Sequence, residues 1–226
     1  MVISGSINKY CYINIRNLPP YFNYKYKLRY FLNEQVSKID KIKHPVIREC
    51  LKNLNYTKKG IEMVHSGDIP ARSGVGSSSS FTVGFLNALF AHIGYTPTKR
   101  ELALKALEIE QDILKESVGS QDQIAAAYGG FNSIKFFKNG KFKVTKIKIS
   151  KKNKEKLSDR LILLYTGVQR TAQNIASKYV NKLNNSKKNQ MKDILDFVPK
   201  AKLFLQDGKL DDFGYLLDES WQKKKN

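Results

Sequence analysis

Residues 70–80 of this 226-residue chain read PARSGVGSSSS, so two glycines and four consecutive serines directly precede a segment with helical periodicity. Gly74 and Gly76 can take the positive φ angles that bring successive backbone N–H groups toward one ligand. The N-terminus of the following helix adds positive potential at the same place, and the serine hydroxyls can donate to phosphate or ligate Mg²⁺. We therefore interpret residues 70–80 as an anion-binding loop.

A flexible linker rich in glycine and serine is the alternative interpretation, and composition alone would favour it. The context argues against a linker, because an apolar helical face begins immediately after the serines; it comprises Phe81, Phe85, Leu86, Leu89, Phe90 and Ile93. The stretch is not a Walker A loop either, since the lysine required after the second glycine is missing.

The segments around this loop alternate between strand-like and helix-like patterns. Runs rich in β-branched and aromatic residues predict strands at residues 7–15, 60–66 and 161–165, and a hairpin of residues 131–137 and 142–149 around the Asn139-Gly140 turn. Apolar residues at helical spacing predict helices at residues 45–54, 81–93, 98–116, 122–127, 172–183, 191–205 and 210–221. Thr98 and Glu101 form a capping box at the start of the third helix. The charged run at 150–156 predicts a boundary between two parts of the chain.

The basic composition makes polyanions the first partners to consider. The chain has 40 lysines and arginines against 20 aspartates and glutamates, a formal charge of +20. The lysines are scattered over the whole length, which argues against nucleic acid as a partner. No apolar stretch approaches the ~20 residues that a membrane span needs, and Cys11 and Cys50 lack the spacing of a metal site or a disulfide framework. We expect a soluble, cytoplasmic protein without a membrane partner, and its oligomeric state stays open.

Two carboxylates are candidates for chemistry near such a loop, because phosphoryl transfer needs a group that accepts the proton of the attacking hydroxyl. Asp122 lies in the sequence SQDQ at the start of a short predicted helix, where it could act only as an N-terminal cap. Glu110 lies on the predicted helix at 98–116, where it could be one more solvated charge. From the residues alone, both alternatives stay open.

The stretch DIPARSGVGSSSSFTVG at residues 68–84 resembles the second motif of the GHMP kinases, Pro-x-x-x-Gly-Leu-Gly-Ser-Ser-Ala, with Val75 for Leu and Ser79 for Ala. Further stretches are similar to the D-glycero-D-manno-heptose 7-phosphate kinase branch of that family. They are SINKY at 6–10, HPVIRE at 44–49, GSQDQIAAAYGGFN at 119–132 and YTGVQR at 165–170. The resemblance runs nearly from one end of the chain to the other.

This resemblance implies an α+β fold of the GHMP-kinase type. Residues 1–155 would form the ATP-binding N-terminal domain, similar to ribosomal protein S5 domain 2 and missing its first strands. Residues 156–226 would form part of a truncated, ferredoxin-like C-terminal domain. The implied function is phosphoryl transfer from ATP, with Mg²⁺, to a hydroxyl of a sugar or sugar phosphate, in particular the anomeric hydroxyl of a heptose 7-phosphate.

The resemblance also implies roles for individual residues. Asp122 would be the catalytic base, and Ser78 and Glu110 would hold Mg²⁺. The residues that would wrap the ATP phosphates are Pro70, Arg72, Gly74, Val75, Gly76, Ser77, Ser78 and Ser79. Thr166, Gly167 and Arg170 would contact the anionic sugar, for which ordinary surface and turn residues are the alternative.

The chain departs from the family pattern at two places. Family members carry an arginine- and glycine-rich first motif, which does not precede Val2, and a glycine-rich third motif, which does not follow Gly167. We therefore expect a fragment with weak or no turnover by itself. A non-catalytic regulator that binds a nucleotide or a sugar is the alternative function.

Overall fold

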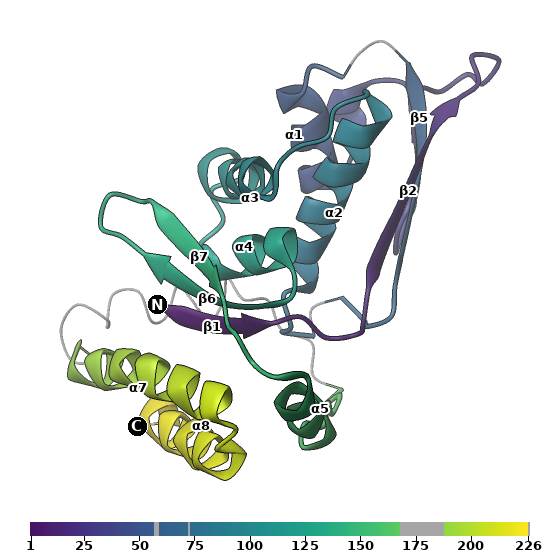
Figure 1. Ribbon diagram of the computed structural model, residues 1–226. Helices are drawn as coiled ribbons and strands as arrows, with labels where there is room; N and C mark the ends of the chain where they lie inside the picture. The colour runs from purple at the N-terminus through teal and green to yellow at the C-terminus, as the bar shows by residue number, and fades with distance from the viewer. Residues whose placement is uncertain (57–58, 72, 168–187, 226) are drawn as a thin grey trace. The chain divides into compact units, whose positions relative to one another are not determined.

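A computed structural model describes residues 1–226 except 57–58, 72, 168–187 and 226 (Figure 1). Contacts divide the described residues into two compact units. One unit comprises residues 7–128, and the other comprises residues 1–6 together with the described residues after 128. The domain boundary expected at residue 155 stays a prediction.

The unit of residues 7–128 contains a four-stranded sheet of order β2-β5-β3-β4. Its strands are β2 (Cys11–Leu18), β3 (Tyr26–Arg29), β4 (Asn33–Val36) and β5 (Gly60–Gly67). β5 pairs antiparallel with β2 and parallel with β3, and β3 pairs antiparallel with β4. The strands predicted at 7–15 and 60–66 are thus confirmed as β2 and β5, whereas the short β3 and β4 escaped the sequence analysis.

Helices cover one face of this sheet (Figure 1). They are α1 (Pro45–Asn53), α2 (Ser77–His92), α3 (Lys99–Leu107) and α4 (Gln121–Tyr128), with a short 3₁₀ turn, η1 (Ile39–Lys41), before α1. The core between helices and sheet includes the fully buried Leu28, Ile47, Met63, Phe85 and Leu89. The capping box predicted at Thr98 is present, since its hydroxyl accepts from the N–H of Glu101 and the Glu101 carboxylate accepts from the N–H of Thr98.

The helix predicted at 98–116 is regular only as far as Leu107. It continues as a π-helical segment, η2 (Glu108–Ile113), in which the N–H of Leu114 donates to the carbonyl of Ile109 at 2.9 Å. The consecutive residues Ile109 and Glu110 are both fully buried there. The wider turn lets two neighbouring side chains lie inside, and such π-segments occur frequently at functional sites.

The other unit contains the antiparallel sheet β1-β6-β7, with β1 (Val2–Gly5), β6 (Phe131–Phe136) and β7 (Phe142–Lys146). Its helices are α5 (Lys151–Asp159), α7 (Lys188–Asp207) and α8 (Leu210–Lys225). The predicted Asn139-Gly140 hairpin is confirmed, with Gly140 at φ 76°. The helices predicted at 191–205 and 210–221 are confirmed as α7 and α8, which pack together through Phe197, Ala201 and Leu216.

One sequence prediction for this unit is wrong. No strand forms at 161–165 in the described part of the chain, and all five of these side chains are exposed. Strand propensity is realised only where a neighbouring strand and a buried face are available. The charged run at 150–156 belongs to helix α5, which Ser150 caps by accepting from the N–H of Asn153 at 3.1 Å. The helix predicted at 172–183 lies outside the described residues.

None of the helices in the described residues combines the length and apolar character needed to cross a membrane.

Replacing Gly60 by alanine tests how closely β5 approaches its neighbours. A Cβ at Gly60 would lie 2.8 Å from the backbone oxygen of Lys25 and 3.2 Å from Cβ of Leu18. Because backbone cannot swing away as a long side chain can, we expect Gly60→Ala to lower the free energy of unfolding by roughly 1–3 kcal/mol. Chemical denaturation measures the loss.

Gly119→Ala is the matched control in the same unit, because no atom lies within 4 Å of its added Cβ. We expect this control to stay within about 0.5 kcal/mol of the unaltered chain. Equal unfolding curves for the two variants would contradict the close packing at Gly60.

Candidate active site

The loop after β5 ends in a glycine that starts helix α2. Gly74 and Gly76 have φ angles of 82° and 76°, in the left-handed region that favours glycine. Gly76 is the N-cap residue, and its carbonyl accepts the first helical hydrogen bond, from the N–H of Ser80 at 2.9 Å. The N–H groups of Ser77, Ser78 and Ser79 precede that bond and have no acceptor within the helix.

α2 therefore begins four residues before the predicted helix at 81–93, and the serines form its first turn. Their side chains consequently point in different directions. Ser78 is exposed, Ser79 is buried, and the hydroxyl of Ser77 lies 3.2 Å from that of Ser73. Successive helical residues are rotated by about 100°, so the three hydroxyls lie on different sides of the helix start.

Asp122 lies against the start of α2. A Cβ built on Gly76 would be 3.7 Å from Cγ of Asp122 and 3.9 Å from its Oδ2. The carboxylate comes from the first turn of α4, which contacts α2. Burial raises the pKa of Asp122 above its usual range, and a hydrogen bond from the Gln121 side chain lowers it by less. The loop and the acid that the sequence singled out are thus adjacent.

Glu110 is a buried carboxylate beside the same turn of α2. Its Oε2 accepts from the hydroxyl of Ser79 at 3.2 Å and from the side-chain amide of Gln123. Its Oε1 is buried and has no hydrogen-bond partner among the described residues. Only 1% of the Glu110 surface is exposed. The alternative interpretation, in which Glu110 is a solvated helical charge, is therefore excluded.

The remaining predicted residues lie in the loop, in the other unit or outside the described residues. Pro70 and Val75 are exposed in the loop, and the carbonyl of Ser78 accepts from the hydroxyl of Thr82 at 3.3 Å. Thr166 and Gly167 are exposed residues of the other unit. Arg72 and Arg170 lie outside the described residues.

Sequence reasoning missed Gln123 and the direction of the Ser79 side chain. Gln123 is fully buried and follows Asp122 directly on α4. The only signal in the sequence that pointed to Gln123 was its neighbour Asp122, the candidate base. Glutamine ordinarily lies on the surface, and no spacing rule links residues 79, 110 and 123.

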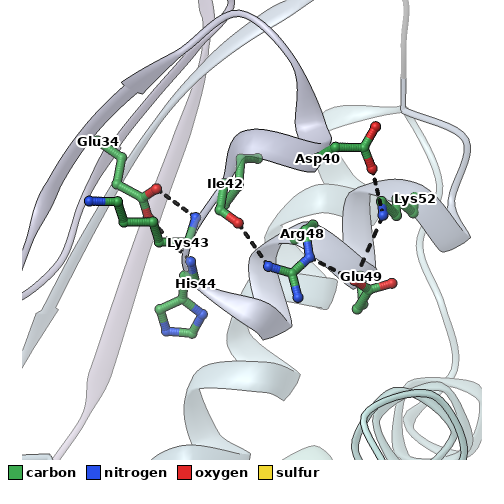
Figure 2. A network of polar contacts seen from close by, with 8 residues as sticks. All are labelled: Glu34, Asp40, Ile42, Lys43, His44, Arg48, Glu49 and Lys52. Carbon is green, nitrogen blue, oxygen red and sulfur yellow. Dashed lines mark hydrogen bonds and ion pairs between the residues drawn. The ribbon is translucent and has the colours of Figure 1, made fainter.

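A polar network anchors the segment before α1 (Figure 2). The carboxylate of Glu34 accepts from the backbone N–H of Lys43 at 2.7 Å, from that of His44 at 3.3 Å and from the hydroxyl of Tyr30. The guanidinium of Arg48 donates to the carbonyl of Ile42 at 2.9 Å. The bonds of Glu34 attach the start of the HPVIRE stretch, residues 44–49, to strand β4.

The His44 ring connects this network to α2. Its centroid lies 4.8 Å from the Tyr30 ring and 4.8 Å from the Phe81 ring. Burial lowers the pKa of His44 to about 4, so the imidazole is neutral near pH 7. His44 therefore packs as an aromatic side chain against the second turn of the helix that begins at the loop.

Together these residues can bind an anionic ligand and accept a proton. The α2 N-terminus offers backbone donors and positive potential to an anion. Asp122, with a raised pKa, is suited to accept a proton from a group held at the loop. Glu110 has one free carboxylate oxygen, which could take a cation.

Several known proteins and one family model are similar to this chain. The model of the GHMP kinases N terminal domain matches residues 41–130. A D-glycero-alpha-D-manno-heptose 7-phosphate kinase of Campylobacter jejuni is 32% identical over 174 residues, which are 76% of this chain and 51% of that protein. A homoserine kinase of Clostridium botulinum is 34% identical over 122 residues, 54% of this chain and 38% of that protein. The matches thus span about half of these curated relatives or less.

Solved structures show the same fold over nearly the whole chain. A D-glycero-D-manno-heptose 1-phosphate kinase from "Bacteriodes thetaiotaomicron" superposes with a TM-score of 0.82 at 24% identity, covering 99% of this chain and 70% of that one. The mevalonate kinase of Methanococcus jannaschii superposes with a TM-score of 0.68 at 20% identity, with coverage of 99% and 70%. The galactokinase of Lactococcus lactis gives 0.62 at 16% identity, with coverage of 99% and 69%. The expected α+β fold is therefore confirmed.

The matched segment contains the glycine loop, Glu110 and Asp122. Residues 41–130 of this chain are therefore a GHMP kinase N-terminal domain.

Proposed function

We propose that this chain takes part in transferring the γ-phosphoryl group of ATP to a hydroxyl of a sugar phosphate, with a heptose 7-phosphate and its anomeric hydroxyl as the first candidate. The observation that carries the proposal is the position of the Asp122 carboxylate directly against Gly76. A phosphate held at the start of α2 would lie beside a group that can accept the proton of an attacking alcohol. The heptose is chosen because two of the similar proteins act, by their names, on heptose phosphates.

Each part of the site has a distinct task in this mechanism. The loop from Pro70 to Ser79 binds the ATP phosphates, with the N–H groups of the first helical turn aimed at their oxygens. Asp122 accepts the proton of the sugar hydroxyl as its oxygen attacks the γ-phosphorus, and the bond to the β-phosphate oxygen breaks to release ADP. The raised pKa of Asp122 strengthens it as a base relative to an ordinary aspartate.

The residues present fit a magnesium ion. Glu110 and Ser78 would hold it, and the fit rests on the partnerless Oε1 of Glu110. Among the described residues, no group of three or more His, Cys, Asp and Glu side chains could hold a metal. Mg²⁺ commonly takes only one or two protein ligands, because substrate phosphates and water supply the remaining ones. When bound, Mg²⁺ would neutralise charge on the transferred phosphate.

The family resemblance also implies roles for residues outside this site. Thr166, Gly167 and Arg170 would contact the sugar phosphate, and Arg72 would contact the nucleotide. Residues 1–155 and 156–226 would be the two domains of the kinase, which would work in the cytoplasm.

An ADP-release assay of the purified chain with Mg²⁺, ATP and heptose 7-phosphate tests the function directly. We expect at most slow ADP release, below the rates of full-length family members, that depends on the heptose 7-phosphate. Homoserine should not support it, because its amine and missing phosphate differ from the proposed substrate. Single-turnover transfer with labelled ATP at high protein concentration detects slow chemistry. Binding of ATP without transfer to any sugar phosphate would contradict a catalytic role and favour the nucleotide-binding alternative.

Asp122→Asn tests the proposed base. We expect transfer to fall by about 10²–10⁴-fold, the usual contribution of a positioned proton acceptor, while ATP affinity changes little. The midpoint of thermal unfolding should stay equal or rise, because the asparagine removes a charge whose ionised form burial disfavours.

Asp112→Asn provides the matched control for that variant, since Asp112 is an exposed aspartate of the same unit. Transfer by the control should equal that of the unaltered chain. Full activity in Asp122→Asn would remove Asp122 from the mechanism.

Gly76→Ala tests the loop itself. Alanine at φ 76° is strained by roughly 1–2 kcal/mol, and its Cβ would contact the carboxylate of Asp122. We expect ADP affinity, measured by calorimetry, to fall at least about tenfold, because the strain is relieved by moving the helix start. Gly119→Ala, which has open space around it, should retain ADP affinity. Unchanged ADP binding in Gly76→Ala would place the nucleotide elsewhere.

A further inference from the structure

We propose that Gln123 and Ser79 are positioning residues that hold Glu110 by one carboxylate oxygen and leave its other oxygen free for a cation. The inference rests on the proposed function, because it describes how the cation ligand of that function is oriented. Ser79 would thus act through Glu110 and not on the phosphates of the nucleotide.

The two donors converge on the same atom from different elements. The hydroxyl of Ser79, on α2, lies 3.2 Å from Oε2 of Glu110, and the amide of Gln123, on α4, donates to the same oxygen. All three side chains are buried, with exposed fractions of 6% for Ser79, 1% for Glu110 and 0% for Gln123. Such a buried carboxylate cannot turn freely, so the direction of its second oxygen is set by these two bonds.

Two buried oxygens of this cluster have no described hydrogen-bond partner, Oε1 of Glu110 and Oε1 of Gln123. A buried carboxylate is stable when its charge is matched by donors or by a cation, and hydrogen bonds to ionised groups are stronger than neutral ones. Both described donors address Oε2, whereas Oε1 is buried without any described partner. Nearly all buried polar atoms are satisfied, so an open carboxylate oxygen indicates a missing ligand. A hard cation that prefers oxygen ligands matches this atom.

Gln123 also links the cation ligand to the proposed base. Asp122 and Gln123 are consecutive on α4, and the first lies against Gly76 while the second holds Glu110. A shift of α4 would therefore move the Asp122 carboxylate together with the amide that holds Glu110. Partners that orient a metal ligand in this way commonly influence metal affinity by 10–100-fold.

Ser79 adds a bond that the family motif lacks. The motif has alanine at this position, so alanine is compatible with the loop and helix, and Ser79→Ala should fold normally. Loss of the Ser79 hydroxyl removes one donor to Glu110 and leaves the amide of Gln123 in place. Ser79→Ala and Gln123→Met each remove one of these donors, so the two substitutions test the two bonds separately.

The experiment measures binding of Mn²⁺, a substitute for Mg²⁺, to the full chain in the presence of ADP. Free Mn²⁺ is followed by its electron paramagnetic resonance signal, which requires no turnover. We expect Gln123→Met, which keeps the volume but removes the amide, to weaken Mn²⁺ binding roughly 10–100-fold. Ser79→Ala should weaken it by roughly three- to tenfold, the size of one hydrogen bond. Binding of ADP without metal should be unchanged in Gln123→Met.

Asn53→Ala is the matched control. The Asn53 amide donates to Glu108 at 2.9 Å, so this variant removes the same kind of bond from a neighbouring carboxylate. Mn²⁺ binding should be unaffected by it. Glu110→Gln removes the charge of the proposed cation ligand itself, so this variant should no longer bind Mn²⁺.

The outcomes separate the inference from the function on which it rests. If Glu110→Gln loses Mn²⁺ while Gln123→Met and Ser79→Ala retain it, the positioning role is wrong and the proposed function stands. If Gln123→Met also loses metal-free ADP binding, its role is structural and the inference is overturned. If the unaltered chain binds no Mn²⁺ with ADP, or Glu110→Gln retains it, the cation site and the inference fail together.

Discussion

The start of α2 depends on a left-handed backbone at Gly76, a conformation that glycine adopts more readily than any other residue. The volume that a Cβ on Gly76 would approach is occupied by the carboxylate of Asp122. This one position brings together a turn that exposes backbone N–H groups and an acid from a helix 46 residues further along the chain. α2 and α4 also contact each other, which keeps the acid beside the loop.

The two carboxylates near the loop have different surroundings, and these surroundings separate their proposed tasks. Asp122 has few donors and a pKa raised by burial, which suits a proton acceptor. Glu110 is held by two donors on one oxygen, which suits a fixed ligand. Similar side chains thus acquire different chemistry from burial and hydrogen bonding, and not from their position in the sequence.

Support for the loop extends beyond the residues that would touch a ligand. Glu34 accepts hydrogen bonds from the backbone N–H groups of Lys43 and His44 (Figure 2). The neutral ring of His44 packs on Phe81 at the second turn of α2. The resemblance of residues 44–49 to the kinase family therefore has a physical basis in this structure. These residues hold the helix that presents the loop, and they need not contact the ligand themselves.

Local signals in the sequence determined much of this protein. Gly74 and Gly76, the capping box at Thr98, the Asn139-Gly140 turn and the periodic apolar residues located the loop, a helix start, a hairpin and most helices, because each depends on neighbours along the chain. Tertiary structure decided the rest. The apolar run at 161–165 found no strand partner in the described chain, and Glu110 turned inward through a π-helical turn. Gln123 and Ser79 met Glu110 only because three helices converge, and no pattern along the chain encodes a contact between residues 79, 110 and 123.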